Sequence, residues 1–407
     1  MVIEVYIERS IEGVIRRLLT QYKVVLVTGP RQVGKTTLLK HALTGTHRYL
    51  TLDDAQALSL ALDDPALFFL NYEPPVVIDE VQYAQSLFRQ IKLLVDQDDQ
   101  RGTIVLTGSQ AYHLMQNVSE SLAGRIAILE MSGLSLREIN SAKDQAAFIP
   151  AESLVGNTSS LKNSAELWRH IHKGSMPELQ RQEIEWDIYY RNYVRSYIER
   201  DVRSLISLKD ENLFYKFLVA LAARTGQLFN ANNIADDIGV TLKTIQNWSS
   251  ILEASGTVRF IRPYFSNVSK QLTKTPKLYF MDCGLVCHLL GWSTPEVLEK
   301  GAMSGQIFET FVVGEILKSY LNAGESLRNI FFYRDVQKRE IDLLIKSEGV
   351  LYPIEIKKGA TPQKDMVKNF SALENLETPI GMGALICLAN RSSYLTENTI
   401  TVPVDHI

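Results

Sequence analysis

The stretch VVLVTGPRQVGKTTLLKHAL, residues 24–43, decides the fold of the amino-terminal part of the chain. It joins a short β-branched and leucine run to a helical pattern through a loop with the spacing G-x-x-x-x-G-K-T. Phosphate oxygens need several converging N–H donors, and a tight glycine-containing loop at a helix amino end presents them. The stretch therefore predicts a loop that binds the phosphates of a nucleotide. The residues assigned to it are Gly29, Pro30, Arg31, Gln32, Val33, Gly34, Lys35, Thr36 and Thr37.

ATP and Mg²⁺ are the ligands that this loop predicts. Lys35 is expected to add a catalytic positive charge, and the Thr36 hydroxyl is expected to hold Mg²⁺. A second apolar run, PPVVIDEVQ at 74–82, ends in two adjacent carboxylates, Asp79 and Glu80, at the strand end where a parallel sheet carries its ligand sites. Strand alternation separates their tasks. Asp79 is predicted to be a Mg²⁺ ligand, and Glu80 is predicted to orient or deprotonate the attacking water.

Two further segments offer polar side chains to the same site. GTIVLTGSQ ends in Thr107, Ser109 and Gln110, which are placed to contact the γ-phosphate or the water, and Ser109 is assigned a catalytic role. In SLAGRIAILEM, Arg125 follows a glycine and is expected to stabilise transition-state charge in this subunit or in a neighbouring one. The alternative for Arg125 is an ordinary ion-paired surface arginine.

Together the phosphate loop, IDEVQ, TGSQ and LAGR resemble the AAA+ type P-loop ATPases of bacteria and archaea. GSMPE at 174–178, YIERDVRSL at 197–205 and KLYFMDCGL at 277–285 extend the resemblance over nearly the whole chain. It implies a carboxy-terminal domain with a restriction-endonuclease-like core and a largely uncharacterised role. Many AAA+ proteins place asparagine at the end of the third strand, where this sequence has Ser109.

Residues 230–264 predict a helix-turn-helix followed by a strand pair, the pattern of a winged helix. The second helix is expected to begin near residue 241 and to present polar side chains to DNA bases or phosphates. These side chains are Thr241, Lys243, Thr244, Gln246 and Asn247. Because residues 226–275 carry a net charge of only +2, the alternative that this unit packs against protein or acts as a lid stays open.

A second catalytic site is predicted in residues 331–359, FFYRDVQKREIDLLIKSEGVLYPIEIKKG. This stretch has the pattern of two strands and a turn. Antiparallel pairing can bring Asp342 beside Glu355 and Lys357, which share one face because they are two residues apart. Two carboxylates can hold Mg²⁺ and activate water against a phosphodiester, with the lysine stabilising charge. Glu309, on an amphipathic helix, is a further candidate ligand. The arrangement resembles the D-x(n)-E-x-K core of nucleases, and its alternative is an interstrand ion pair.

Composition and charge limit the classes of protein and of binding partner that fit this chain. The 407 residues carry 43 Lys and Arg against 46 Asp and Glu, so any binding of nucleic acid must be local. Three cysteines are too few for a disulfide framework, and no 18-residue apolar run is present. The stretch MVIEVYIERSIEGVIRRLL has no uninterrupted apolar segment, so no secretory leader is expected. We therefore expect a cytoplasmic protein without membrane contact. Cys283, Cys287 and His288 are expected to belong to a buried core, because they lack the spacing of a metal site.

The predicted fold class is α/β: a P-loop core with a parallel sheet, a helical lid, a winged helix and a restriction-endonuclease-like domain. The predicted boundaries are 1–160, 161–225, 226–275 and 276–407. The expected function is ATP hydrolysis that repositions the last two units on DNA, in a chain able to form homo-oligomers. The alternative is a nucleotide-dependent regulator or assembly protein whose last domain binds DNA or protein without cleaving.

Overall fold

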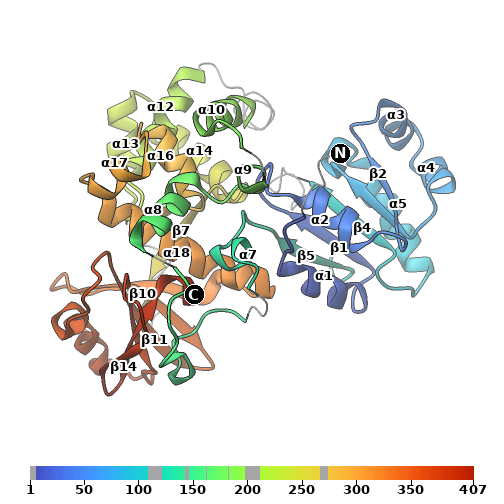
Figure 1. The fold of residues 1–407 in the computed structure, drawn as a ribbon. Coiled ribbons are helices and arrows are strands. Elements are labelled where there is room, and N and C mark those ends of the chain that lie inside the picture. The colour runs from blue at the N-terminus through green and yellow to red at the C-terminus, as the bar shows by residue number, and fades with distance from the viewer. Residues whose placement is uncertain are drawn as a thin grey trace.

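The computed structural model describes residues 6–108, 122–142, 146–161, 163–181, 183–197, 211–265 and 274–407. Within them the chain is an α/β protein with two sheets, one of five strands and one of nine. Figure 1 shows the amino-terminal lobe, in blue, beside a larger body that holds the rest of the chain. None of the helices in these ranges is long and apolar enough to cross a membrane.

The sheet of the amino-terminal lobe is entirely parallel and has the order β2-β3-β4-β1-β5. Its strands are β1 (Val24–Thr28), β2 (Arg48–Thr51), β3 (Val76–Asp79), β4 (Ile104–Gly108) and β5 (Ile126–Glu130). The β-branched runs at 24–27, 49–52, 76–78 and 103–106 predict the first four strands to within two residues at each end, whereas no run predicted β5. Since β1 lies between β4 and β5, the loop that follows β1 lies near the middle of the sheet's carboxyl edge.

Helices cover both faces of this sheet, and each face has its own apolar core. The helices are α1 (Ile11–Leu19), α2 (Lys35–Ala42), α3 (Ala55–Asp63), α4 (Pro65–Asn71) and α5 (Ser86–Gln97). The alternation of strands and helices along the chain explains this layering, because a parallel strand pair needs a crossover connection.

A helical region connects the two sheets. It comprises α7 (Leu136–Ile139), α8 (Ser164–Lys173), α9 (Pro177–Arg181), α10 (Trp186–Tyr197) and α12 (Glu211–Ala222). In Figure 1, α7 and α9 lie where the amino-terminal lobe meets the larger body. The polar stretch before α8 runs along the far sheet, where Gly156 and Ser159 donate backbone hydrogen bonds to Ser392 and Asn390.

The next elements follow the predicted order of two helices and a strand pair. They are β6 (Gln227–Leu228), α13 (Ala231–Ile238), α14 (Leu242–Ala254), β7 (Val258–Pro263) and β8 (Lys277–Phe280). β8 pairs antiparallel with both β6 and β7. The Thr241 hydroxyl caps α14 by accepting a hydrogen bond from the amide of Thr244 at 3.2 Å, so these two residues serve the helix end.

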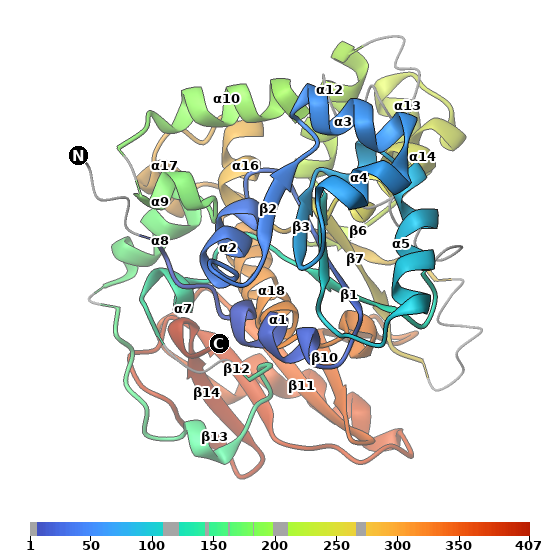
Figure 2. The same cartoon turned by 90° about the vertical axis from the view of Figure 1, so that its right-hand side faces the viewer.

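The last part of the chain begins with helices α16 (Cys283–Leu289), α17 (Pro295–Lys300) and α18 (Ser304–Ala323). Cys283 and Cys287 are buried, as predicted for core residues. α18 is buried along almost its whole length, with α1 packed against it on the side of the amino-terminal lobe. Figure 2 shows α18 directly behind α1.

The second sheet crosses the predicted domain boundary at residue 275. Its order is β13-β14-β12-β11-β10-β9-β7-β8-β6, so strands from both sides of that boundary share one sheet. The junction is a parallel pairing of β7 with β9, in which Arg262 stands opposite Phe331. The later strands are β9 (Ile330–Arg334), β10 (Glu340–Ser347), β11 (Val350–Lys357), β12 (Gly383–Cys387), β13 (Ser393–Thr396) and β14 (Thr399–Pro403).

Candidate active site

The predicted phosphate loop connects β1 to α2 at the carboxyl edge of the first sheet. Gly29 has a φ of +141°, and a Cβ atom built there would lie 2.0 Å from the carbonyl oxygen of Met131. Gly34, immediately before α2, has a φ of +93°. The loop thus requires glycine at both motif positions, once for close backbone approach and once for a left-handed conformation.

Lys35 turns inward over the loop that it belongs to. Its Nζ donates hydrogen bonds to the carbonyl oxygens of Gly29 at 2.9 Å and Pro30 at 2.7 Å, and the residue is buried. Lys35 also acts electrostatically on Glu80, because its positive charge favours the ionised form of that carboxyl and lowers its pKa. A phosphate group within the loop would be a charged acceptor for the same ammonium.

The side chains of Thr36 and Asp79 meet at the end of β3. The Thr36 hydroxyl donates to Oδ2 of Asp79 at 2.7 Å, and the Tyr49 hydroxyl donates to the same oxygen at 2.6 Å. Burial raises the pKa of Tyr49, and its hydrogen bond to Asp79 raises it further. The structure thus brings Thr36 and Asp79 together. It adds Tyr49 of the neighbouring strand β2, which was not predicted from the sequence.

Glu80 lies beside this pair in a left-handed conformation, with a φ of +58°. Its carboxylate accepts a hydrogen bond from Nε2 of the Gln82 side chain. Burial raises the pKa of Glu80 above its ordinary value, against the opposing effect of the Gln82 hydrogen bond. A carboxylate with a raised pKa next to a phosphate loop has the properties of a general base.

Unpartnered polar atoms support a ligand at this edge. The buried hydroxyls of Thr28 and Thr107, at the ends of β1 and β4, have no hydrogen-bond partner among the described residues. Such groups are costly unless something satisfies them, so they fit a site built for a polar ligand. The predicted roles of Ser109 and Gln110 fall outside the described residues.

Arg125 lies at the other edge of the sheet. It immediately precedes β5, and its carbonyl oxygen accepts a hydrogen bond from the amide of Val24 at the start of β1. The phosphate loop follows the opposite end of β1, so Arg125 does not reach the loop of its own chain. Its guanidinium is paired with Asp96 of α5, with Nη2 to Oδ2 at 3.0 Å. An action on a neighbouring subunit stays a prediction.

A buried ion pair that the sequence analysis missed ties the phosphate loop to α7. Arg9 donates to the carbonyl oxygen of Val33 at 2.7 Å and to Oε1 of Glu138 at 3.0 Å. Burial alone would raise the pKa of Glu138, but Arg9 and the amides of Ser135 and Ser10 outweigh it, so the pKa is lowered. The capping box Ser135-x-x-Glu138 was a readable signal for the α7 end of this link.

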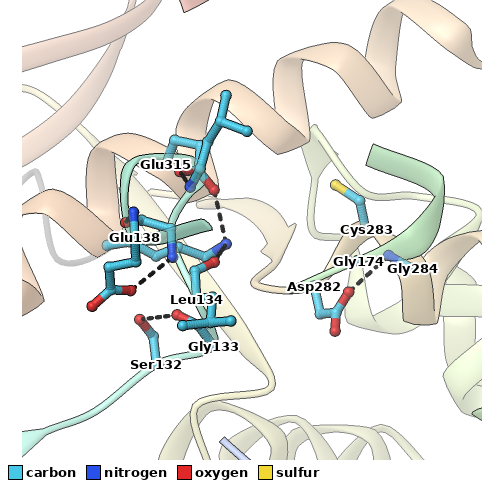
Figure 3. A network of polar contacts seen from close by, with 12 residues as sticks. Ser132, Gly133, Leu134, Glu138, Gly174, Asp282, Cys283, Gly284 and Glu315 are labelled. Carbon is cyan, nitrogen blue, oxygen red and sulfur yellow. Dashed lines mark hydrogen bonds and ion pairs between the residues drawn. The ribbon is translucent and has the colours of Figure 1, made fainter. Parts of the chain in front are cut away.

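The same segment is bound from its other side by α18. Glu315 Oε2 accepts a hydrogen bond from the amide of Leu136 at 2.7 Å, and Lys318 Nζ donates to the carbonyl oxygen of Leu134 at 3.0 Å. Lys318 and Glu315 also form a buried ion pair at 2.8 Å. Figure 3 shows Glu315, Leu134 and Glu138 gathered at this junction. Polar contacts therefore lead from the phosphate loop to α18.

A second polar cluster lies on the large sheet. Leu343 of β10 stands opposite Ile354 of β11, so the next pair in this antiparallel register is Asp342 with Glu355, on one face. Lys357 Nζ lies 2.5 Å from Oε1 of Glu355 and 3.5 Å from Oδ2 of Asp342. The three residues predicted to converge do so. Burial, followed by the nearby charge of Asp342, raises the pKa of Glu355.

Glu309 of α18 belongs to the same cluster but is bound to other partners. The hydroxyl of Tyr279 donates to its Oε1 at 2.6 Å, and Nζ of Lys277 lies 3.2 Å from that oxygen. Burial and the charge of Asp342 raise the pKa of Glu309. Neither donor was predicted from the sequence, although Lys277 and Tyr279 are two residues apart on one strand and therefore share a face.

The carboxylates of this cluster differ in how well each could bind a divalent cation. Within the described ranges, no three Asp, Glu, His or Cys side chains come together as a ready metal-binding group. Yet Glu355 is buried, and its Oε2 atom has no hydrogen-bond partner in those ranges. An unpartnered buried carboxylate oxygen fits a cation ligand, so Asp342 and Glu355 stay candidates.

The exposed face of α14 carries the side chains that were expected there. Lys243, Gln246 and Asn247 are exposed, whereas Ile245 and Trp248 are buried against the rest of the larger body. Contact of this face with nucleic acid stays a prediction.

Comparison with known families identifies the first lobe. Residues 21–140 match the model of a family described as an AAA domain, which covers the loop, Asp79 and Glu80. This part of the chain is therefore an AAA-type P-loop ATPase domain, a class that binds ATP with Mg²⁺. Residues 164–296 and 304–407 match two families described only as domains of unknown function, DUF8612 and DUF4143.

The relatives found carry no assigned activity. The chain is 28% identical over 395 residues to an uncharacterised protein of Mycobacterium tuberculosis, covering 97% of this chain and 82% of that one. An uncharacterised protein of Haemophilus influenzae is 24% identical over 290 residues, covering 68% of this chain and 64% of that protein.

Two solved structures are similar at low scores. A Walker-type ATPase of Pyrococcus abyssi has a TM-score of 0.40 at 15% identity, covering 70% of this chain and 96% of the other. The RuvB Holliday junction branch migration motor of Thermotoga maritima has a TM-score of 0.29 at 16% identity, covering 61% and 88%. Neither structure defines an activity for this chain.

Proposed function

We propose that this protein hydrolyses ATP at its amino-terminal lobe and uses the nucleotide state to act on DNA through its larger body. The observation that carries the hydrolytic part is the meeting of Thr36 and Asp79 at 2.7 Å beside the loop lysine Lys35 and the half-buried Glu80, the proposed base. These four side chains provide the charge, the metal ligands and the proton acceptor that phosphoryl transfer requires.

Each residue has a defined task in this proposal. Lys35 exchanges its contacts with the carbonyls of Gly29 and Pro30 for phosphate oxygens. Thr36 and Asp79 hold Mg²⁺, which when bound neutralises charge on the terminal phosphates. Glu80 orients the attacking water and accepts its proton.

Replacement of Lys35 by alanine tests the ATPase assignment. Lys35→Ala is expected to abolish ATP hydrolysis and to weaken ATP binding, because it removes the cation held over the loop. Phosphate release and nucleotide titration measure both effects. Arg89→Ala, at an exposed position on α5, is the control and should keep wild-type turnover. Wild-type turnover in Lys35→Ala would contradict the assignment.

We further propose that the larger body contains a winged-helix unit and a restriction-endonuclease-like unit. The order α13, α14, β7, β8 supports the former, and the side of β10 and β11 that bears Asp342, Glu355 and Lys357 supports the latter. In this proposal Asp342 and Glu355 hold Mg²⁺ or Mn²⁺, which would activate water against a phosphodiester, and Lys357 stabilises the developing charge.

Cleavage is tested separately from ATP turnover. Asp342→Ala is expected to remove any metal-dependent hydrolysis of DNA while ATP turnover persists, because the two sites lie on different sheets. Lys357→Ala should lower the rate but keep metal binding. Incubation of labelled DNA with Mg²⁺ or Mn²⁺, with and without ATP, measures both.

A second candidate function is a nucleotide-dependent regulator whose last domain binds DNA or protein without cleaving. The observation that favours it is the fixed pairing of Glu309 with Lys277, which leaves fewer carboxylates for metal. Purified protein that cuts no DNA under any of these conditions, yet hydrolyses ATP, would support this candidate over the nuclease.

A further inference from the structure

Lys277 is a buried cation inside the second polar cluster. It begins β8, its side chain is only 4% exposed, and its Nζ lies 3.2 Å from Oε1 of Glu309 and 2.6 Å from Oε1 of Glu340. The ring of Phe332 lies 5.6 Å from the same nitrogen. The ammonium therefore bridges a helix carboxylate and a strand carboxylate in a place from which water is largely excluded.

The carboxylates of the cluster are satisfied unequally. Glu309 receives two donors on a single oxygen, the Tyr279 hydroxyl at 2.6 Å and the Lys277 ammonium. Glu355 gives one oxygen to Lys357 and keeps the other buried and unpartnered among the described residues. Asp342 accepts the backbone amide of Ile356 at 2.8 Å. Lys277 thus pairs a buried positive charge with Glu309. At Glu355 the charged partner is Lys357, whose side chain is 40% exposed, and the second carboxylate oxygen has no partner among the described residues.

A buried ammonium and a divalent cation compete for the same carboxylate. Both are attracted to its charge, and they repel each other strongly where water does not screen them. Lys277 is covalently attached and is held by Glu340 as well, so a metal ion at Glu309 would lie beside an ammonium that cannot move away.

We propose that Lys277 is an internal counter-ion that replaces a divalent cation at Glu309, so that the cluster accepts one metal ion, held by Asp342 and Glu355. Glu309 is then a positioning partner of Lys277 and not a ligand. This inference rests on the proposed metal site of the larger body and specifies how many ions that site takes.

Metal counting on the full chain tests the proposal without reference to cleavage. Nucleotide-free protein is titrated with Mn²⁺, and bound and free ion are separated by electron paramagnetic resonance and calorimetry. We expect one Mn²⁺ per wild-type chain, lost in Asp342→Asn and bound within about twofold of wild-type affinity in Glu309→Gln.

Lys277→Met keeps the length of the side chain and removes its charge. It should bind a second Mn²⁺, or bind the first at least tenfold more tightly, and adding Glu309→Gln should reverse that gain. Lys277→Arg, which keeps the charge, should behave as wild type.

The outcomes separate this inference from the proposed nuclease site. Loss of the wild-type ion in Glu309→Gln, or an unchanged Mn²⁺ titration in folded Lys277→Met, overturns the counter-ion role while the metal site survives. If Lys277→Met does not fold, as judged by its melting midpoint, Glu309→Gln alone decides. Wild-type protein that binds no Mn²⁺ contradicts the nuclease site. In that case a Glu309-dependent ion gained by Lys277→Met still supports the counter-ion, and no gain overturns it.

Discussion

Glu80 shows how a single residue can be assigned a task from its surroundings. It follows directly on the metal-ligand candidate Asp79, and burial raises its pKa. Glu80→Gln is expected to bind ATP with Mg²⁺ and to slow hydrolysis roughly 10²–10⁴-fold, because the ligands survive and the base is lost. Nucleotide binding by fluorescence and single-turnover phosphate release check this. Normal turnover in Glu80→Gln would move the base to a residue of the segment after β4.

His172 leads to a prediction about pH at the same scale. It is buried in α8, donates from Nε2 to the carbonyl oxygen of Trp292 at 2.8 Å, and stacks on Trp186. Burial lowers the pKa of His172 below its ordinary value. As pH falls, His172 is therefore protonated in the unfolded chain at a higher pH than in the folded protein. The free energy of unfolding should decrease below about pH 6.5, by at most about 1.4 kcal/mol per pH unit for this one proton.

Urea unfolding between pH 7 and 5 measures this effect. His172→Gln keeps a donor for the Trp292 carbonyl and cannot titrate, so its stability should depend less steeply on pH than that of wild type. Gln21→Ala, at an exposed position, removes no titratable group and is the control that should keep the wild-type slope. An unchanged slope in His172→Gln would assign the acid sensitivity to other groups.

At the scale of elements, α14 carries the prediction about DNA. Its exposed side chains include Lys243 and Gln246, while Thr241 is used as the helix cap. Lys243→Ala should weaken binding of a fluorescent duplex and reduce the dependence of affinity on salt by about one ion, because one phosphate contact is lost. Lys216→Ala, exposed on α12, is the control. If affinity and salt slope stay unchanged in Lys243→Ala, the unit serves protein packing.

The buried pair on α18 should contribute strongly to stability. Glu315→Gln leaves the Lys318 ammonium buried without its anion, and Lys318→Met leaves the Glu315 carboxylate buried without its cation. Each substitution is expected to lower the free energy of unfolding by about 3–5 kcal/mol. The double variant should cost less than the sum of the two, and urea unfolding of all four proteins measures the coupling. The exposed pair Arg191 and Asp187 on α10 is the control, with an expected coupling of about 0–1 kcal/mol. Strict additivity at Glu315 and Lys318 would contradict a direct link.

Elements defined by local pattern could be predicted, and those defined by distant partners could not. The spacing from Gly29 to Thr36 fixes a loop within a few residues, and the alternation around Asp342 and Glu355 fixes a shared face. Arg125 lies at the edge of the first sheet opposite to the phosphate loop. That placement depends on the register of β5 with β1, which no local pattern of residues specifies. Likewise, the pairing of Lys277 with Glu309 needs the packing of α18 on β8.

For the whole molecule, the shared nine-stranded sheet predicts joint unfolding. Because β7 pairs with β8 on one side and β9 on the other, loss of either neighbour exposes its backbone groups. Amide hydrogen exchange in increasing urea should therefore show β7, β8, β9 and β10 losing protection at one urea concentration. Strands of the first sheet provide the internal reference. Exchange of β7 well before β9 would show instead that the sheet divides at this junction.

The parallel contact between β7 and β9 also bears on how the chain is made. β7 leaves the ribosome before either of its neighbouring strands. β8 follows within about 15 residues, whereas β9 follows only about 70 residues later, so one edge of β7 stays open for longer. At ordinary rates of synthesis this is a wait of about 3 to 14 seconds. During that time the open edge of β7 is available to any other strand nearby, including the same strand of a chain growing on the next ribosome.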